Sequence, residues 1–259
     1  MIIKDAKKYA EYILRGSKTV LVLGMHRSGT SVTTEMISKL GASTGDTIRG
    51  DDWNERGYWE HAWGWQINGQ ILDHSGGTWD APPPSVRVSW RIRLRMCRLI
   101  GRLHADGGTT VWKDPRNILT LPVWRPLIIN YVPVAVFRHP MSVAQSLQKR
   151  NDFSIERGLR LWNDYNKRLL GIADREDEIL FVDFDGGRSH IRSRLQLLAE
   201  QVPELQYTTG AVEPYSEGLR TSDNRASIPN EDVRSTYDAI QEHVTSRKVY
   251  TKPSSSSTD

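Results

Sequence analysis

Residues 18–31, Lys-Thr-Val-Leu-Val-Leu-Gly-Met-His-Arg-Ser-Gly-Thr-Ser, contain the pattern that decides the fold of this chain. The first six residues form a β-branched, apolar run that ends at Gly24, which predicts a buried strand. Apolar residues then recur at helical spacing from Thr30 to Leu40, and Gly41 follows, which predicts a helix. A strand, a glycine-containing loop and a helix in this order open a nucleotide-binding α/β unit.

The loop from Gly24 to Ser31 keeps both glycines and the final hydroxyl of the phosphate-binding pattern Gly-x4-Gly-Lys-[Ser/Thr]. Backbone N–H groups and a helix N-terminus would face an anion there. However, Thr30 replaces the lysine, and Arg27 lies inside the loop. No predicted strand ends in the usual magnesium-holding aspartate, so the pattern favours an anionic donor that needs no metal. The alternative is a plain glycine turn between strand and helix.

Strands and helices continue to alternate along the chain. Further strands are predicted at 110–113, 132–137 and 178–184. Further helices are predicted at 4–14, 62–72, 86–103, 140–149, 155–173, 191–201 and 231–244. This alternation indicates a three-layer α/β fold with a mostly parallel sheet between helices. Ligands of such sheets bind beyond the C-terminal strand ends, where the glycine loop, Lys113 and Arg138 are all expected.

A second motif, Arg138-His-Pro-Met-Ser-Val-Ala-Gln-Ser146, places a serine eight residues after an arginine. Arg138 leaves a strand end, Pro140 suits the first turn of a helix, and Ser146 lies about two helical turns further on. The two side chains are therefore placed to hold one phosphate between them. In the alternative interpretation, Arg138 only pairs with a surface carboxylate.

Together these motifs resemble those of sulfotransferases that use 3'-phosphoadenosine-5'-phosphosulfate (PAPS), including bacterial-type members, which have a P-loop nucleoside triphosphate hydrolase-like fold. Gly-x-x-Arg-Ser-Gly-Thr-Ser is similar to the family's 5'-phosphosulfate loop. Arg-x7-Ser, with proline two residues after the arginine, is similar to its 3'-phosphate motif. The resemblance implies that the PAPS-binding residues are Arg27, Ser28, Gly29, Thr30, Ser31, Arg138 and Ser146. His26 also lies in the phosphate loop, where we expect it to be a positioning group.

A third element is Trp112-Lys-Asp-Pro-Arg116. A lysine at a strand end offsets charge that develops on the transferred sulfuryl group and on the leaving phosphate. Many sulfotransferases carry a lysine in a place comparable to Lys113. Cytosolic members follow it with a histidine that acts as the base, whereas Asp114 follows it here. We expect Asp114 to orient Lys113 or Arg116.

The base that accepts the proton of the acceptor hydroxyl is expected in Asn54-Glu-Arg-Gly-Tyr-Trp-Glu-His61. This segment resembles one that is common in bacterial sulfotransferase-like proteins. Glu60 is the first candidate base and His61 the second. The alternative is that Glu60 caps the helix predicted to begin near Ala62.

Two clusters of side chains bear on the identity of the acceptor, and each has two interpretations. Five tryptophans between residues 53 and 79 form either an acceptor wall or an aromatic core or lid. Five arginines between residues 87 and 98 form either a solvated helix face or a surface for an anionic acceptor.

The C-terminal third carries weaker signals. Cytosolic relatives grip the 3'-phosphate with a basic, glycine-containing segment near the C-terminus, which this chain lacks in recognisable form. Arg220 is the candidate substitute. We expect residues 1–252 to form a single sulfotransferase domain and the serine-rich tail, 253–259, to be disordered.

Composition sets the cellular expectations. The 259 residues include 35 Lys and Arg against 31 Asp and Glu, a net charge of +4 that fits an anionic ligand without identifying it. No apolar stretch reaches the length of a membrane span, and residues 1–15 lack a signal-peptide core. The single cysteine, Cys97, cannot form an internal disulfide, so we expect a reducing, cytoplasmic location.

The predicted function is the transfer of a sulfuryl group from PAPS to a hydroxyl of an acceptor, a carbohydrate or glycoconjugate, without a metal or a nucleic-acid partner. The candidate catalytic residues are Arg27, Lys113, Glu60 and His61. One alternative is a P-loop kinase or other phosphotransferase, against which the threonine at position 30 weighs. The other is a non-catalytic module that binds a nucleotide or polyanion.

Overall fold

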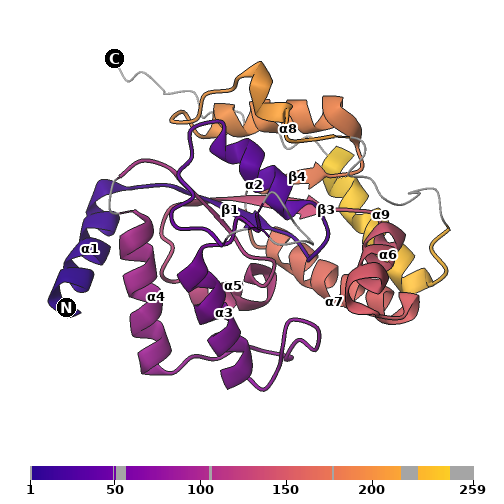
Figure 1. The fold of residues 1–259 in the computed structure, drawn as a ribbon, viewed down its shortest axis with the longest axis horizontal. Coiled ribbons are helices and arrows are strands. Elements are labelled where there is room, and N and C mark those ends of the chain that lie inside the picture. Colours follow the sequence, from indigo (N-terminus) through magenta and orange to yellow (C-terminus); the bar gives the residue numbers. More distant parts are fainter. Residues whose placement is uncertain are drawn as a thin grey trace, which may run out of the picture.

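The structure is a computed structural model that describes residues 2–48, 50, 57–104, 107–176, 178–216 and 227–245. Within these residues, helices surround a sheet of four parallel strands in the order β2-β1-β3-β4 (Figure 1). The strands are β1 (Thr19–Leu23), β2 (Thr110–Lys113), β3 (Tyr131–Phe137) and β4 (Leu180–Asp183). All four strands and the three-layer α/β fold were predicted from the sequence.

The register of the strands brings their C-terminal ends to one edge of the sheet. Val22 of β1 pairs with Lys113 of β2, and Phe137 of β3 pairs with Asp183 of β4. Because the strands are parallel, the segments that follow them leave from the same edge. The glycine loop, Lys113 and Arg138 therefore share that edge, as predicted.

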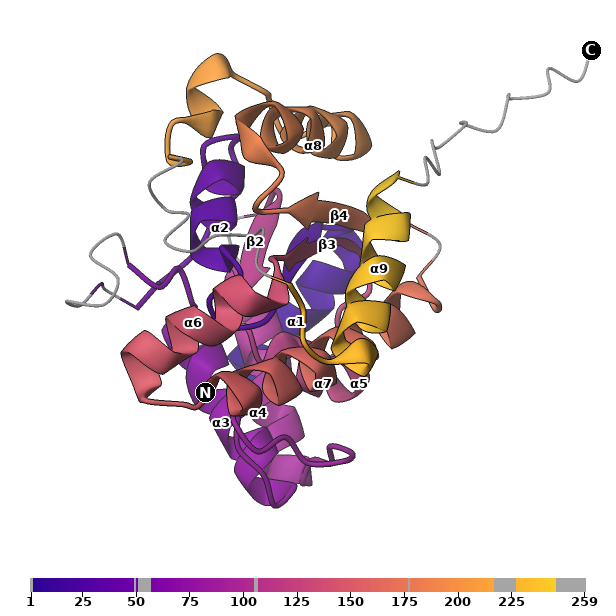
Figure 2. The same ribbon diagram turned by 90° about the vertical axis from the view of Figure 1, so that its right-hand side faces the viewer.

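Side chains of β1 alternate between two cores, because neighbouring residues of a strand point to opposite faces. Val20 and Val22 join one core together with α2, α8 and a 3-10 helix. Leu21 and Leu23 join the other core with the remaining helices. Figures 1 and 2 show α2 and α8 on one side of the sheet and α3, α4, α5 and α7 on the other.

The helices follow the predicted pattern with shifted ends. Their bounds are α1 (Ile2–Arg15), α2 (Thr30–Ser38), α3 (Ala62–His74), α4 (Trp90–Leu103), α5 (Asn117–Trp124), α6 (Pro140–Asn151), α7 (Ile155–Ala173), α8 (Gly187–Gln201), α9 (Glu231–Thr245) and the 3-10 helix Thr209–Val212. α4 begins four residues later than predicted, because the Ser89 hydroxyl caps it by accepting from Ile92 N at 3.4 Å.

α5 was not predicted. It contains Pro122, a residue that usually ends a helix because it lacks an N–H donor. Here Leu119, Leu121 and Trp124 are buried in the larger core, so tertiary packing outweighs the local signal.

Among the described helices, none combines the length and apolar character that a membrane span requires. The limits of a single domain at 1–252 stay a prediction, and the tail 253–259 lies outside the described residues.

Candidate active site

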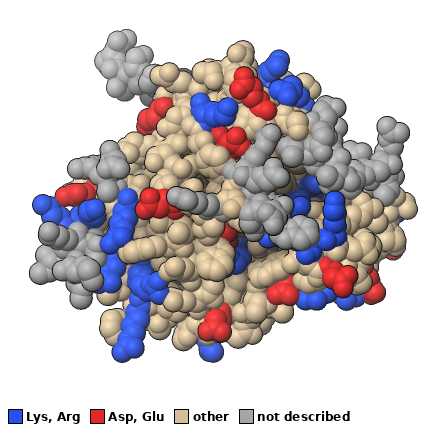
Figure 3. Space-filling model, viewed as in Figure 1, with Lys and Arg blue, Asp and Glu red and all other residues tan. Residues whose placement is uncertain are grey.

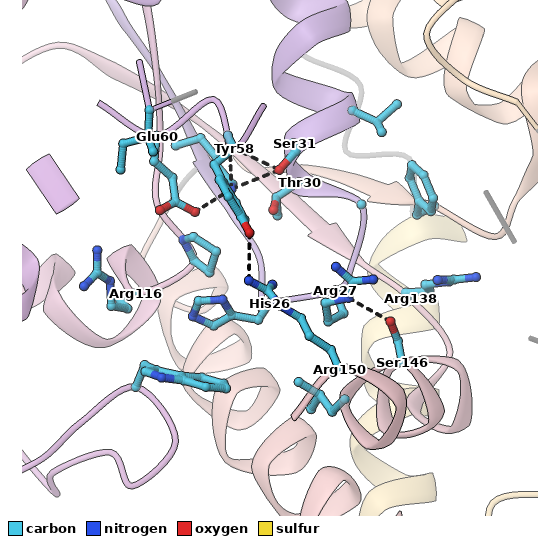
Figure 4. Close-up of a pocket in the computed structure, with 18 of the residues that line it drawn as sticks. His26, Arg27, Thr30, Ser31, Tyr58, Glu60, Arg116, Arg138, Ser146 and Arg150 are labelled. Atoms are coloured by element: carbon cyan, nitrogen blue, oxygen red, sulfur yellow. Dashed lines mark hydrogen bonds and ion pairs between the residues drawn. The ribbon is translucent and has the colours of Figure 1, made fainter. Parts of the chain in front are cut away.

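A pocket of about 710 Å³ lies at the C-terminal edge of the sheet (Figure 4). It brings together most residues of the predicted site, although they come from four separate stretches of the chain. The predicted residues that line it are His26, Arg27, Gly29, Thr30, Ser31, Glu60, Lys113, Arg138 and Ser146.

The glycine loop is shaped by contacts that only glycine allows. Gly29 has φ 89°, and a Cβ there would meet the Phe184 ring at 2.2 Å. A Cβ at Gly24 would lie 2.5 Å from the carbonyl oxygen of Val136, so the loop contacts β3 directly. Arg27 also adopts a left-handed conformation, with φ 67°, which is unusual for a non-glycine residue and indicates a strained position. Its side chain lines the pocket.

The two predicted phosphate motifs touch each other. Arg27 Nε donates a hydrogen bond of 2.7 Å to Ser146 Oγ, although the residues are 119 positions apart in the chain (Figure 4). Burial, reinforced by the nearby Arg150 cation, lowers the pKa of Arg27. An anion in the pocket would relieve this penalty by stabilising the charged guanidinium.

Arg138 is held by a carboxylate and still faces the pocket. Its Nε donates to Asp185 Oδ1 at 3.0 Å, and Asp185 Oδ2 accepts from His139 N at 3.1 Å. Asp185 is buried, so the alternative that Arg138 pairs with a surface carboxylate is wrong. Arg138 Nη2 is buried and has no hydrogen-bond partner among the described residues. One donor therefore stays available for a ligand.

Lys113 forms a buried ion pair with Glu60. Its Nζ lies 2.8 Å from Glu60 Oε1, 2.9 Å from the carbonyl oxygen of Tyr58 and 3.2 Å from Ser31 Oγ. Burial raises the pKa of Glu60, and the adjacent Lys113 cation opposes that rise. A carboxylate with a raised pKa, facing a pocket, has the properties of a general base.

Asp114 orients Arg116, one of the two roles predicted for it. The carboxylate accepts from Arg116 Nε at 2.9 Å and Nη2 at 2.7 Å, and from Asn68 Nδ2 at 2.9 Å. Burial alone would raise the pKa of Asp114, but Arg116 and these hydrogen bonds outweigh it and lower the pKa. Arg116 is thereby fixed at the pocket wall.

Two predicted residues of the described structure, His61 and Ser28, are not among those that line the pocket. His61 caps α3, where its Nδ1 accepts from Trp63 N at 3.2 Å and from Gly64 N at 3.5 Å. The alternative that Glu60 is this cap is therefore wrong, and His61 as a base is not supported because it is absent from the pocket lining. The Ser28 hydroxyl is buried away from the lining, and Arg220 lies outside the described residues.

Other pocket residues were missed. Arg150 lines the pocket, and its Nη2 donates to Tyr58 Oη at 2.9 Å (Figure 4). The signal was present, because Arg150 follows Ser146 by four residues and so shares its helix face. The predicted residue His26 is half-buried with its ring 4.6 Å from that of Trp79, and desolvation lowers the pKa of His26 to about 3. A neutral positioning role fits this histidine.

Comparison with solved structures finds sulfotransferase domains. A sulfotransferase domain from the Synechococcus PCC 7002 olefin synthase is 15% identical with a TM-score of 0.54, covering 89% of this chain and 95% of that one. A sulfotransferase domain from the curacin biosynthetic pathway is 12% identical with a TM-score of 0.53, covering 87% and 98%. Sulfotransferase STF1 from Mycobacterium tuberculosis H37Rv is 14% identical with a TM-score of 0.50, covering 92% and 81%.

No protein-family model and no curated protein sequence matches the chain. At identities of 12–15%, the likeness to solved structures concerns the fold. The chain has the P-loop nucleoside triphosphate hydrolase-like fold of sulfotransferase domains, as its motifs predicted.

Proposed function

We propose that this protein is a sulfotransferase that moves the sulfuryl group of PAPS to a hydroxyl of an acceptor, a saccharide or glycoconjugate. The observation that supports this most directly is the 2.7 Å contact between Arg27 of the glycine loop and Ser146 of the second motif. It means that both motifs face one pocket, so a single doubly phosphorylated nucleotide could span them. Two separate pockets would have argued against the proposal.

The chemistry of the pocket fits such a donor. Arg27 and Arg150 line it and have no carboxylate partner among the described residues, and Arg138 Nη2 lacks a hydrogen-bond partner there. Guanidinium groups suit phosphate because of their planar, forked donors. The strained backbone of Arg27 also fits a position selected for binding rather than for stability. We assign the 5' side to the loop residues 26, 27 and 29–31, which line the pocket, and the 3' side to Arg138 and Ser146.

When bound, PAPS supplies the sulfuryl group and leaves as adenosine 3',5'-bisphosphate. The acceptor oxygen forms a bond to sulfur while the bond between sulfur and the bridging phosphate oxygen breaks, and the electron pair of that bond leaves on the phosphate. Glu60 takes the proton of the acceptor hydroxyl, for which its raised pKa suits it. Lys113 and Arg27 bind the negative charge that develops at the bridging oxygen.

Calorimetry and an assay of sulfate transfer test the proposal together. We expect adenosine 3',5'-bisphosphate to bind more tightly than ATP with magnesium, and labelled sulfate to pass from PAPS to a hydroxyl acceptor. Failure to bind adenosine 3',5'-bisphosphate would refute the proposal. Binding without transfer to any acceptor would favour a non-catalytic module, and magnesium-dependent consumption of ATP would favour a phosphotransferase.

The cytoplasmic location expected from the lone Cys97 belongs to the same proposal.

A further inference from the structure

A second hollow, of about 320 Å³, adjoins the pocket along one side of α3. We call it the acceptor groove, and its lining consists of Trp65, Gln66, Gly69, Gln70, Asp73 and Arg116. Trp65 and Arg116 also line the main pocket, so the two hollows share a wall. We propose that the acceptor groove binds a neutral saccharide and presents one of its hydroxyls to Glu60. This inference rests on the proposed function.

The groove has the mixed chemistry that a sugar requires. Trp65 is 48% exposed, so its indole offers an apolar surface on which a sugar ring can pack. Gln66, Gln70 and Asp73 are hydrogen-bonding groups for the hydroxyls at the ring edge. Both amide groups are held in place, because Arg95 Nη1 donates to Gln70 Oε1 at 2.7 Å and its Nη2 to Gln66 Oε1 at 3.5 Å.

Glycine at position 69 keeps the groove open. It lies inside α3, where alanine would stabilise the helix, so its presence calls for another reason. A Cβ built at Gly69 would meet only Arg116 Nη1, at an ordinary 3.6 Å. Packing therefore does not demand glycine at this position, but a larger side chain would project into the groove.

The charge of the site argues for a neutral acceptor. Three cations of the main pocket already have carboxylate partners: Lys113 with Glu60, Arg116 with Asp114, and Arg138 with Asp185. Arg27 and Arg150 are the two lining cations without such a partner among the described residues. One phosphate monoester alone carries a charge of about −1.5 to −2. PAPS therefore neutralises the positive charge of Arg27 and Arg150, and no uncompensated charge of the pocket is left for an anionic acceptor.

The groove adds no cation of its own that could hold an anionic acceptor. Arg116 is already paired, and Asp73 would repel an anion. Figure 3 shows Lys and Arg side chains over the region of α4, but this surface has other contacts. Arg91 lies over the Trp90 ring at 5.4 Å, and Arg102 over the Trp63 ring at 3.9 Å. None of the five arginines between residues 87 and 98 is among the lining residues of the groove, although Arg95 contacts Gln66 and Gln70 from outside the lining. This weakens the alternative of an anionic acceptor.

The position of the groove fits transfer to an acceptor. Figure 4 shows Glu60 and Arg116 on one side of the pocket and Arg138 and Ser146 on the other. Arg116 Nη2 donates to the carbonyl oxygen of Trp65 at 3.0 Å, which ties the groove to the Glu60 side. A sugar on Trp65 would therefore approach the candidate base from the side opposite the phosphate-binding groups.

The first test fills the groove. Gly69→Leu should raise the KM for a neutral saccharide at least about tenfold. The affinity for adenosine 3',5'-bisphosphate should stay within about twofold. Gly171→Leu is the matched control, because Gly171 also lies inside a helix and a Cβ there meets nothing within 4 Å. An unchanged KM in Gly69→Leu would overturn the inference.

The second test removes the indole of Trp65, the apolar surface on which the sugar ring would pack. Trp65→Ala should raise the same KM about tenfold, while Trp63→Ala should leave it unchanged. Trp63 is 36% exposed on the same helix but contacts Arg102 and lines neither hollow.

A panel of acceptors separates the two proposals. It contains neutral mono-, di- and trisaccharides, oligogalacturonates and 4-nitrophenol, with labelled PAPS as the donor. Sulfation of a neutral saccharide with the highest kcat/KM supports the inference. Preference for the oligogalacturonates or the phenol overturns the inference but leaves the sulfotransferase proposal standing. Binding of adenosine 3',5'-bisphosphate without binding of any saccharide, measured by saturation-transfer NMR, also overturns it. Failure to bind the bisphosphate counts against the proposed function instead.

Discussion

The two ends of the sheet differ in whether their buried polar groups have hydrogen-bond partners. At the N-terminal ends of the strands, Thr19 Oγ1 lies 3.0 Å from His104 Nε2, and Thr110 Oγ1 donates to the carbonyl oxygen of Leu103 at 3.1 Å. At the C-terminal ends, His26 Nε2 and Arg138 Nη2 are buried without a hydrogen-bond partner in the described part of the chain. Thr109 Oγ1 is the exception at the first end, because it is buried without a partner in the described part of the chain. The two unpaired nitrogens at the second end belong to residues that line the pocket, where a ligand can reach them.

This difference has an energetic meaning. A buried donor without a partner costs about 1–3 kcal/mol, and a strained residue such as Arg27 costs a similar amount. Both costs occur in residues that line the pocket. We therefore expect substitutions at the pocket end to reduce function more than stability, and substitutions at the other end to do the reverse.

The largest effect is expected at Glu60. Glu60→Gln should lower kcat about 10³-fold, because the amide cannot accept the acceptor proton. In the unmodified protein, kcat should fall with decreasing pH, since the base must be deprotonated. Its raised pKa places this fall above the ordinary glutamate range. Steady-state kinetics across pH check both effects.

The same pH profile distinguishes a base from a residue that only positions Lys113. If Glu60 is the base, the acidic fall in kcat should disappear in Glu60→Gln. A variant that loses turnover but keeps the acidic fall would mean that another group accepts the proton.

Arg27 should have the next largest effect. Arg27→Ala should lower kcat about 100-fold, or about 3 kcal/mol, if the guanidinium acts in the transition state. Arg27→Gly should lose the same turnover. Its free energy of unfolding should be about 1 kcal/mol larger than that of Arg27→Ala, because glycine tolerates φ 67°. Denaturant unfolding measures the second difference. Intact turnover in both variants would refute the catalytic role.

Arg138 tests the binding side of the comparison. Arg138→Lys should weaken the affinity for adenosine 3',5'-bisphosphate about tenfold, because lysine cannot hold Asp185 and a phosphate with one rigid fork. Arg157→Lys is the control, since Arg157 pairs with Asp80 at 2.7 Å on the exposed surface. Calorimetry should show no change for Arg157→Lys. Equal affinities for both variants would contradict the assigned role of Arg138.

The smallest effect on function is expected at His104. Burial lowers the pKa of His104 to about 4, so the unfolded chain binds a proton at higher pH than the folded chain does. The free energy of unfolding should therefore fall by about 2–3 kcal/mol from this group as pH drops from about 6.5 to about 4. His104→Gln should show a shallower fall, with bisphosphate affinity at pH 7.5 unchanged. Identical pH slopes would contradict this account.

Sequence reasoning was most successful where the signal is local. The strand before Gly24 and the Arg138–Ser146 spacing depend on neighbouring residues, and the structure reproduces the elements predicted from them. The parallel register then explains why segments far apart in the chain meet at one edge. The placement of Lys113 at that edge could therefore be predicted.

The sequence could not supply contacts that depend on how distant segments pack. Asp185 follows β4 and reaches Arg138 only because β3 and β4 are neighbours in the sheet. His61 and Glu60 are adjacent and chemically suited to either role, so their order could not be decided without knowing which one caps α3. Glu60 was identified as the first candidate, but its ion pair with Lys113 became visible only in three dimensions.

The main-chain contact at residue 58 has a consequence for mutagenesis. Lys113 Nζ and Ser31 Oγ both donate to the carbonyl oxygen of Tyr58, an atom that every amino acid supplies. An alanine scan would therefore report only the loss of the Tyr58 ring and its bond to Arg150. Deleting one residue between positions 57 and 60 would change which carbonyl reaches Lys113. Spacing, rather than residue identity, is what this part of the chain must preserve.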